Sequence, residues 1–306
     1  MSTEVSLEPA QSAGPDTGTA ATSPMGQAKA GPRRLKWLSA HAEMAVGIGV
    51  LIALAASSFV VPSMSHTSVD ALVDVPSQAP SDHHPFGTDQ LGRDMLVRVF
   101  YAIRIDLGIT LAAVLISLAI GVATGLLIGL SPRPIAEFLQ RFIDAVLAIP
   151  YLVFVLAIVA FTRTHTILPF LPGGVAAIVL ALAVTGWANY ARITAGQTRI
   201  LVSRESVIAV RLLGFSTARI VARHIVPEVI RPNISLAGSH AVLVTAASAS
   251  LAFLGAGVTP PTPELGAIMQ GGTALIRSAW WIAVIPGIAI VLIGLGFSLI
   301  ADARED

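Results

Sequence analysis

Six apolar stretches, each close to the roughly 20 residues with which an α-helix crosses a bilayer, dominate this sequence. Apolar residues make up 54% of the chain and charged residues only 12%, whereas a soluble domain carries roughly 25% charged residues. None of the stretches shows the period of two that is typical of membrane barrel strands. The sequence therefore predicts an all-α, polytopic bundle of about six transmembrane helices, at about 44–61, 108–130, 142–161, 174–190, 234–255 and 281–301.

The remaining segments lie around these helices. The N-terminal part is rich in Ser, Thr, Ala, Gly and Pro, and such a segment cannot bury enough apolar surface to become ordered. We expect a disordered cytoplasmic tail at 1–40, a first transmembrane helix at 41–63, an outer loop with an amphipathic helix at 64–107, and a core of five helices at 108–302 that contains a cytoplasmic loop at 191–233.

The distribution of Lys and Arg predicts the orientation. Cytoplasmic loops of membrane proteins carry an excess of positive charge. With both termini in the cytoplasm, 14 of the 19 Lys and Arg residues fall on the cytoplasmic side, and seven of them lie in the loop 191–233. We therefore predict an N-in, C-in topology.

The sequence lacks the motifs of several common enzyme classes. The only lysines are Lys29 and Lys36, so no glycine-rich loop ends in the Gly-Lys-Ser/Thr of a phosphate-binding loop. The chain has no cysteine, no Gly-x-Ser-x-Gly elbow and no His-Glu-x-x-His zinc motif. We interpret Asp82-His83-His84 as solvated or structural rather than as a metal site. A net charge of +1 gives no basic field for nucleic acid. We expect no catalytic residue, no metal site and no ATPase site in this chain.

The cytoplasmic loop is predicted to form two short helices joined by a glycine. Ser203 is placed to cap the first helix, and Gly214 is placed to end it in a left-handed conformation. Ser216 is placed to cap the second helix, which Pro227 ends. An apolar face of this kind is buried either against the inner ends of the bundle or the lipid headgroup layer, or against a soluble partner. Its members are Val207, Ile208, Val210 and Leu212 in the first helix and Ile220, Val221, His224 and Ile225 in the second.

Ionisable side chains inside a membrane are costly and are therefore candidates for function. We place two of them within the predicted helices. Asp144 begins the third helix, where a carboxylate interacts with the positive end of the helix dipole. His240 either lines a pathway or hydrogen-bonds a neighbouring helix. Ser248 and Ser250 either line the translocation path or allow helices to pack closely.

The first outer segment contains a turn followed by a helix start. Pro85 and Gly87 shape the turn, and Thr88 or Asp89 is placed to cap the helix. The amphipathic stretch that follows is expected to lie on the outer membrane surface. Its apolar members are Leu91, Met95, Leu96, Val99, Phe100 and Ile103.

The second outer segment contains three prolines, Pro260, Pro261 and Pro263, which make it stiff and not helical. One interpretation is a rigid loop that holds two helices apart. The other is a contact surface for an outer partner, or the lining of an outer gate.

The stretch RESVIAVRLLGFSTARIVARHIVP, which ends at Pro227, resembles the coupling loop of binding-protein-dependent ABC importer permeases. The pattern of that family is Glu-Ala-Ala, three residues, Gly, and about a dozen more to Leu-Pro. Glu205 matches an acidic position common in the peptide branch. The pattern itself falls on Ile208, Ala209, Val210, Gly214, Val226 and Pro227, with Ile208, Val210 and Val226 as departures from it.

Four further segments are similar to the dipeptide/oligopeptide/nickel branch of these permeases, and the resemblance covers about residues 80–302. Each segment alone is moderately specific, whereas all of them in the correct order and topology are highly specific. They are HPFGTDQLGRD at 84–94, DAVLAIPYLVF at 144–154, TGWANYARI at 185–193 and SASLAFLGAGVTPPTPELGAIM at 248–269.

This resemblance implies a type I ABC importer permease fold, multi-pass in the bacterial inner membrane. It implies a second homologous permease as a heterodimer partner, a solute-binding protein outside, and two cytoplasmic ATPase subunits that use ATP and Mg. This chain would then form half of the pathway for di- or oligopeptides and would bind no cofactor itself. The alternative is an ATP-independent secondary carrier or channel subunit, which usually needs intramembrane acids or a lined filter. The resemblance assigns ATPase docking to Glu205, Ile208, Ala209, Val210, Arg211 and Gly214.

Overall fold

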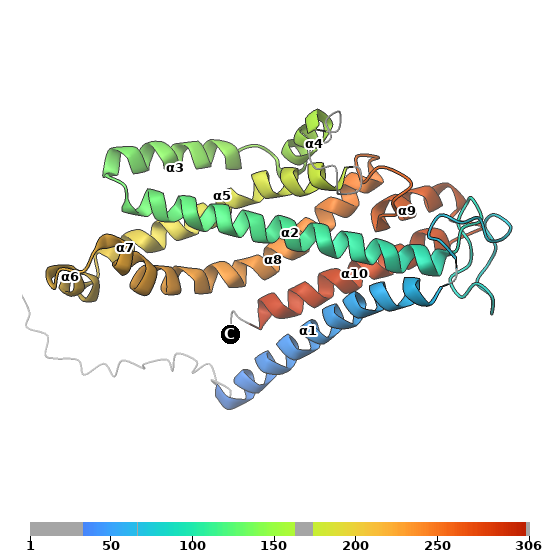
Figure 1. The fold of residues 1–306 in the computed structure, drawn as a ribbon, viewed down its shortest axis with the longest axis horizontal. Coiled ribbons are helices and arrows are strands. Elements are labelled where there is room, and N and C mark those ends of the chain that lie inside the picture. The colour runs from blue at the N-terminus through green and yellow to red at the C-terminus, as the bar shows by residue number, and fades with distance from the viewer. Residues whose placement is uncertain (1–32, 66, 163–173, 304–306) are drawn as a thin grey trace, which may run out of the picture.

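The computed structural model describes residues 33–65, 67–162 and 174–303, and these ranges form helices and irregular loops without any strand. The helices run side by side in an elongated bundle (Figure 1). Residues 1–32 of the predicted tail at 1–40 lie outside the described residues, whereas residues 33–40 are not a tail but the first residues of α1. The helices are α1 Arg33–Met64, α2 Met95–Leu130, α3 Arg133–Leu147, α4 Tyr151–Thr162, α5 Val175–Val202, α6 Glu205–Leu212, α7 Thr217–Ile220, α8 Val226–Phe253, α9 Leu265–Gly272 and α10 Trp281–Asp302.

The number of crossings agrees with the sequence. Within the described ranges, five helical stretches are each long and apolar enough to cross a membrane, and α3 with α4 forms a sixth if this bent pair is counted as one span. Helix α1 begins and α10 finishes toward the left in Figure 1, and α6 and α7 lie further out on the same side. The prediction of an all-α membrane bundle with both ends on one side is therefore confirmed.

The third predicted span, 142–161, is not one straight helix. Helices α3 and α4 meet at an angle of 87°. Pro150 lies in the break between them, because proline has no N–H for the helix and also disfavours helical geometry at Ile149 before it. The first half of α3 is not a continuous apolar run, because Arg133, Glu137 and Arg141 interrupt it. The predicted span therefore did not include this half.

The second span starts earlier than predicted. Helix α2 is continuous from Met95, so the expected interfacial helix and the expected span at 108–130 are one element. Met95, Val99 and Ile103 were assigned to the outer membrane surface. All three lie in the main hydrophobic core, where protein rather than lipid covers them.

The cap of α2 also differs from the prediction. Neither Thr88 nor Asp89 caps this helix. Asp94 does, because its Oδ1 accepts hydrogen bonds from the amides of Leu96 at 2.8 Å and Val97 at 3.1 Å. The other carboxylate oxygen of Asp94 lies 2.8 Å from Nδ1 of His84, which gives this histidine a structural role.

Helices α2 and α5 approach each other closely at two glycines. A Cβ atom added at Gly121 would lie 2.5 Å from the carbonyl oxygen of Trp187, and one added at Gly125 would lie 2.6 Å from that of Ala191. Small residues at such positions let transmembrane helices pack backbone against backbone. Larger side chains at either glycine would force α2 and α5 apart.

The outer segment 67–94 is folded onto the ends of the helices. Gly87 has a φ of +72°, which confirms the predicted turn. The indole nitrogen of Trp281 in α10 donates a hydrogen bond to the carbonyl of Thr88 at 3.1 Å. Arg98 of α2 donates to the carbonyl of Val69 at 3.1 Å and pairs with Asp70 at 3.0 Å. This segment therefore ties α2 to α10 at the outer end.

Candidate functional site

Helix α6 projects from the inner end of the bundle, between the ends of α5 and α8 (Figure 1). The predicted cap at Ser203 is wrong, because its hydroxyl donates back to the carbonyl of Ile200 at 2.8 Å. The predicted cap at Ser216 is confirmed, since its hydroxyl oxygen accepts from the amide of Arg219 at 3.4 Å. The segment between α5 and α8 is thus shorter than the predicted loop 191–233 and spans residues 203–225.

Gly214 ends α6 in the predicted left-handed conformation, with a φ of +84°. The amide of Gly214 donates to the carbonyl of Arg211 at 3.0 Å, and the amide of Phe215 donates to that of Val210 at 3.4 Å. These two bonds form a Schellman motif, which satisfies carbonyls that the helix end leaves free. Apart from its two chain neighbours, a Cβ atom at Gly214 would meet no described atom within 4 Å. The glycine is therefore required by backbone geometry and not by crowding within this chain.

Pro227 does not end the second helix. Helix α7, a π-helical turn at Val221–Ile225 and α8 follow each other without a break, and the helical stretch runs from Thr217 to Phe253. Pro227 lies in the first turn of α8. In the first turn of a standard helix the backbone N–H groups have no regular partner, so proline, which lacks an N–H, fits there. The π-helical turn absorbs the change in hydrogen bonding, as such turns often do inside longer helices. The segment that carries α6 is therefore joined directly to a membrane-crossing helix.

One face of this segment is packed against the bundle. Val207, Ile220, Ile225 and Val229 are buried in a small apolar cluster with Leu201 of α5. This cluster is separate from the main core. The first alternative for the apolar face, packing on the inner helix ends, therefore holds for these residues.

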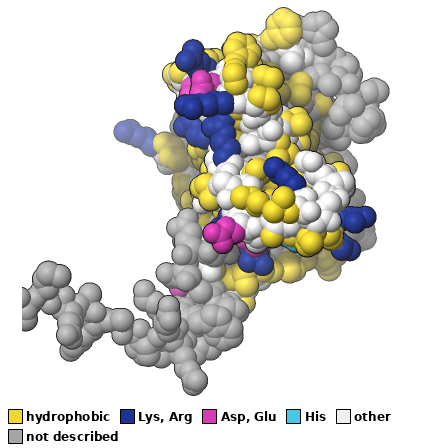
Figure 2. Space-filling model, turned by 90° about the vertical axis from the view of Figure 1, so that its left-hand side faces the viewer, with side chains coloured by type: hydrophobic (Ala, Val, Ile, Leu, Met, Phe, Trp, Pro, Cys, Tyr) yellow, Lys and Arg dark blue, Asp and Glu magenta, His cyan; other side chains and the backbone are white. Residues whose placement is uncertain are grey.

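Another part of the apolar face has no cover in the described part of the chain. Leu212 is 83% exposed, Leu213 76% and Ile208 45%. Ala209 and Gly214 are exposed beside them, and Arg219 lies 5.3 Å above the exposed ring of Phe215. Figure 2 shows this end of the molecule, where apolar side chains lie open among arginines. The second alternative, a surface for another protein, fits these residues.

Asp144 has a different role from the predicted one. It lies in the last turns of α3, not at a helix start, so the helix dipole does not stabilise it there. Its carboxylate forms an ion pair of 2.6 Å with Arg192 of α5, and both side chains are more than half exposed. This pair joins α3 to α5 on the surface.

The three residues predicted for a translocation pathway do not share one environment. His240 is buried, and its Nδ1 lies 3.0 Å from the hydroxyl of Tyr190, so it bonds a neighbouring helix. Ser248 is buried and donates to Oε1 of Glu264 at 3.1 Å. Ser250 is half-buried and donates to the carbonyl of Ala246 in its own helix at 2.7 Å. Their part in a pathway stays a prediction.

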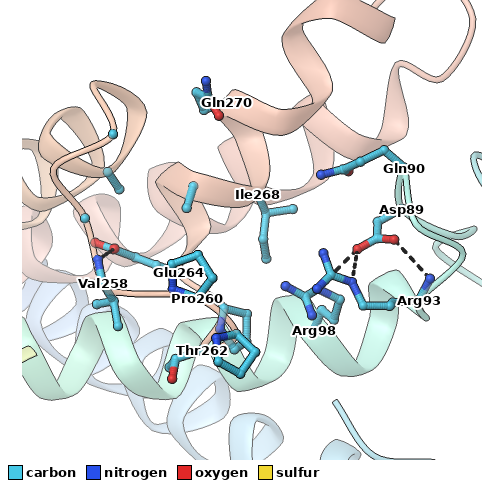
Figure 3. Close-up of a pocket in the computed structure, with 16 residues that line it drawn as sticks. Asp89, Gln90, Arg93, Arg98, Val258, Pro260, Thr262, Glu264, Ile268 and Gln270 are labelled. Carbon is cyan, nitrogen blue, oxygen red and sulfur yellow. Dashed lines mark hydrogen bonds and ion pairs between the residues drawn. The ribbon is translucent and has the colours of Figure 1, made fainter. Parts of the chain in front are cut away.

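A cavity of about 260 Å³ lies at the outer end of the bundle (Figure 3). Pro260, Pro261 and Pro263 line one side of it. On the opposite side, Asp89 stands between two arginines, with Arg93 at 2.6 Å and Arg98 at 3.4 Å (Figure 3). The predicted stiff outer loop is thus one wall of a cavity whose other wall is an ion-pair network of the outer segment.

Two buried acids were missed by the sequence analysis, Asp106 of α2 and Glu264 at the start of α9. Glu264 accepts hydrogen bonds from the amide of Val258 at 2.6 Å and from Ser248. Burial raises the pKa of the Glu264 carboxyl, and these two hydrogen bonds offset part of the rise. Asp106 accepts a hydrogen bond from the amide of Leu265 at 3.1 Å. The signal for Asp106 was an acid within an apolar run, but the predicted span began two residues later.

Comparisons with known proteins identify the family. The family model of the "binding-protein-dependent transport system inner membrane component" matches residues 121–305, more than half of the chain. The chain is 37% identical over 223 residues to the di/tripeptide transport system permease protein DppC of Pseudomonas aeruginosa (strain UCBPP-PA14), covering 72% of this chain and 70% of that protein. It is 33% identical over 230 residues to the oligopeptide transport system permease protein OppC of Bacillus subtilis (strain 168), covering 74% of this chain and 72% of that protein.

A solved structure shares the fold. The chain is similar to a chain of the inward-facing MetNI methionine ABC transporter, with a TM-score of 0.52 and 18% sequence identity, over 69% of this chain and 94% of that one. At this identity the likeness concerns the fold alone. Together with the matched family model and the two permease relatives, the helices and the exposed inner segment show that this chain belongs to the family of binding-protein-dependent inner membrane transport components, as a multi-pass permease subunit of an ABC importer.

Proposed function

We propose that this permease imports peptides, and that the exposed surface of α6 and Gly214 is where a separate ATPase subunit docks. The names of the relatives supply the cargo class, since they are di/tripeptide, dipeptide and oligopeptide permeases. The observation that carries the docking surface is the exposure of Leu212, Leu213 and Ile208 at the inner end. Exposed apolar surface outside the bilayer marks a site for a partner protein.

The connection of this surface to the bundle supports a rigid-body mechanism. Val207 and Ile220 hold the segment on the inner ends of α5 and α8, and the helical stretch from Thr217 continues to Phe253. A displacement of α6 by closing ATPase subunits is therefore passed to α5 and α8 as a movement of whole helices. ATP and Mg are used by the ATPase, and this chain binds neither.

The remaining partners follow from the same proposal. A second, homologous permease completes the pathway, to which this chain contributes half. A solute-binding protein delivers cargo at the outer end, where Pro260, Pro261 and Pro263 line the cavity. Peptides then enter the pathway between the two permeases.

Uptake of a labelled dipeptide tests the function. In cells that carry this chain, uptake is expected to stop when ATP is depleted while the proton gradient is held, and deletion of the chain is expected to abolish it. Leu212→Glu with Leu213→Glu is expected to reduce ATP-driven uptake at least about tenfold, because two charges are placed in an apolar contact. The matched control, Leu212→Met with Leu213→Met, keeps the surface apolar and is expected to keep uptake. Uptake that continues without ATP would overturn the proposal in favour of a secondary carrier.

A further inference from the structure

An open groove of about 620 Å³ lies between the end of α1, the start of the outer segment and the outer part of α2. The described residues that line it include Phe59, Ser63, Thr67, Ser68, Tyr101 and Arg104. The apolar span of α1 ends at Met64, directly after the residues that α1 contributes to the groove. The groove is therefore placed where α1 leaves the hydrocarbon core of the membrane and the lipid headgroups begin.

Arg104 is the only charged side chain among the described residues that line the groove. It is exposed, and in the described part of the chain it contacts aromatic rings and no carboxylate. The neighbouring acids are engaged elsewhere. Asp70 forms an ion pair of 3.0 Å with Arg98, and Asp106 accepts a hydrogen bond from the amide of Leu265 in α9. The groove therefore carries a positive charge that this chain does not compensate.

Two aromatic rings hold the guanidinium group of Arg104 in the groove. Its Cζ atom lies 4.3 Å from the ring centroid of Phe59 and 5.9 Å from that of Tyr101. A snorkelling arginine extends its head group toward bulk water, whereas this one lies against rings of two helices. A cation–π contact uses the charge of the guanidinium but leaves its N–H donors free. These donors have the fork geometry that matches the oxygens of a phosphate group.

The wall that the outer segment contributes is fixed in place. The buried Arg98 donates a hydrogen bond to the carbonyl of Val69 at 3.1 Å and pairs with Asp70. Before them, the hydroxyl oxygens of Ser65 and Thr67 lie 2.7 Å apart, and the amide of Thr67 donates to Ser65 at 3.3 Å. The chain that follows α1 is thus anchored on α2, and the groove is part of the fold.

The groove also has an apolar wall, which is formed by α1. Among the five apolar spans of the described ranges, α1 is buried least, since 11% of its most apolar stretch is buried, against 39–56% in the other four. Phe59 and Val60 at the groove are 54% and 51% exposed. A cationic group beside exposed apolar side chains matches the two parts of a phospholipid, whereas a free phosphate ion would use only the first.

We propose that this groove binds an anionic phospholipid of the outer leaflet, with its phosphate group on Arg104 and its acyl chains along Phe59 and Val60. The bound lipid joins the end of α1 to α2 at the outer side of the membrane. The site involves neither ATPase docking nor peptide cargo, so it goes beyond the proposed function.

The test uses the full chain, purified in detergent and freed of lipid, and native mass spectrometry measures the lipid that it binds during a titration. The probes are phosphatidylglycerol and a diacylglycerol with the same acyl chains, which lacks the phosphate. Diacylglycerol is expected to bind at least about fivefold more weakly, since one basic residue near a membrane surface contributes about this factor. An excess of inorganic phosphate is expected to leave phosphatidylglycerol bound, because it has no acyl chains.

Three variants locate the site. Arg104→Gln removes the charge and is expected to weaken phosphatidylglycerol binding at least about fivefold, with diacylglycerol binding unchanged. Arg277→Gln, the same change at an exposed arginine outside the groove, is expected to change neither. Ser68→Asp adds a negative charge at an exposed lining position and is expected to weaken phosphatidylglycerol binding. If Arg104→Gln does not fold, Ser68→Asp takes its place.

Three outcomes would overturn the proposal. One is equal affinity of the wild type for phosphatidylglycerol and diacylglycerol, which needs no variant. Another is an equal effect of Arg104→Gln and Arg277→Gln on phosphatidylglycerol binding. The third is displacement of phosphatidylglycerol by inorganic phosphate, which would identify a site for the free ion instead of a lipid.

Discussion

The hydroxyl oxygen of Tyr190 lies 3.0 Å from Nδ1 of His240, and both side chains are buried. The bond joins α5 to α8 in the middle of the bundle, and the two rings also meet edge to face, with centroids 5.4 Å apart. Since α5 and α8 are the helices that hold the cytoplasmic segment, this contact couples the two elements that must move together.

Removal of the Tyr190 hydroxyl is therefore expected to weaken the α5–α8 contact. Tyr190→Phe keeps the ring and leaves Nδ1 of His240 without its partner, which costs about 0.5–1.5 kcal/mol. The measurement is the thermal unfolding of the purified chain in lipid nanodiscs. Tyr101→Phe, at a half-buried tyrosine near the outer end of α2, serves as the control. Equal effects of the two variants would contradict a special role for the Tyr190–His240 bond.

The ion pairs at the outer cavity are expected to matter far more than ion pairs on the surface. Asp89→Ala leaves Arg98, 5% exposed, without its buried carboxylate partner, and the expected cost is about 3 kcal/mol. Glu137→Ala breaks the exposed pair with Arg133, 2.8 Å long, and the expected cost is below about 1 kcal/mol. Both costs are measured as the loss of stability that each variant shows in thermal unfolding. A small loss for Asp89→Ala would show that the outer segment does not depend on this network.

A substitution at Gly214 can show whether this residue is needed for its left-handed backbone conformation or for docking of the ATPase. Asparagine tolerates the left-handed conformation, so Gly214→Asn is expected to keep the membrane level and thermal stability of the chain. Its side chain nevertheless projects from the exposed end of α6, and uptake of the dipeptide is expected to fall at least about tenfold. Because a Cβ at this position meets no described atom within 4 Å beyond its own chain neighbours, a loss of uptake points to a partner. Normal uptake by a stable Gly214→Asn chain would contradict docking at this glycine.

Much of the fold could be predicted because the membrane imposes a simple pattern. The apolar runs located α1, α5, α8 and α10, and the excess of arginine predicted which end faces the cytoplasm. The predicted left-handed conformation of Gly214 and the predicted cap at Ser216 were also correct, since both depend only on the neighbouring backbone.

The errors arose where tertiary contacts override a local pattern. The start of α2 was misplaced because Arg98 and Asp106 interrupt the apolar run, although ion pairs and protein burial accommodate both. Pro227 was expected to stop a helix, but a π-helical turn lets the chain continue. The pairing of Asp106 with the start of α9 links residues 159 positions apart, and no local signal could show that they meet.

Contact between α6 and an ATPase is the central claim, and a single crosslink tests it most directly. The chain contains no cysteine, so Ala209→Cys, exposed on α6, introduces the only thiol. In native membranes a short bifunctional reagent is expected to join it to a soluble ATPase subunit, with a yield that changes when ATP is added. Glu137→Cys, exposed on α3, is expected to give no such product. If the thiol at position 209 reacts with a maleimide from the inside but yields no crosslinked ATPase, docking at α6 is contradicted.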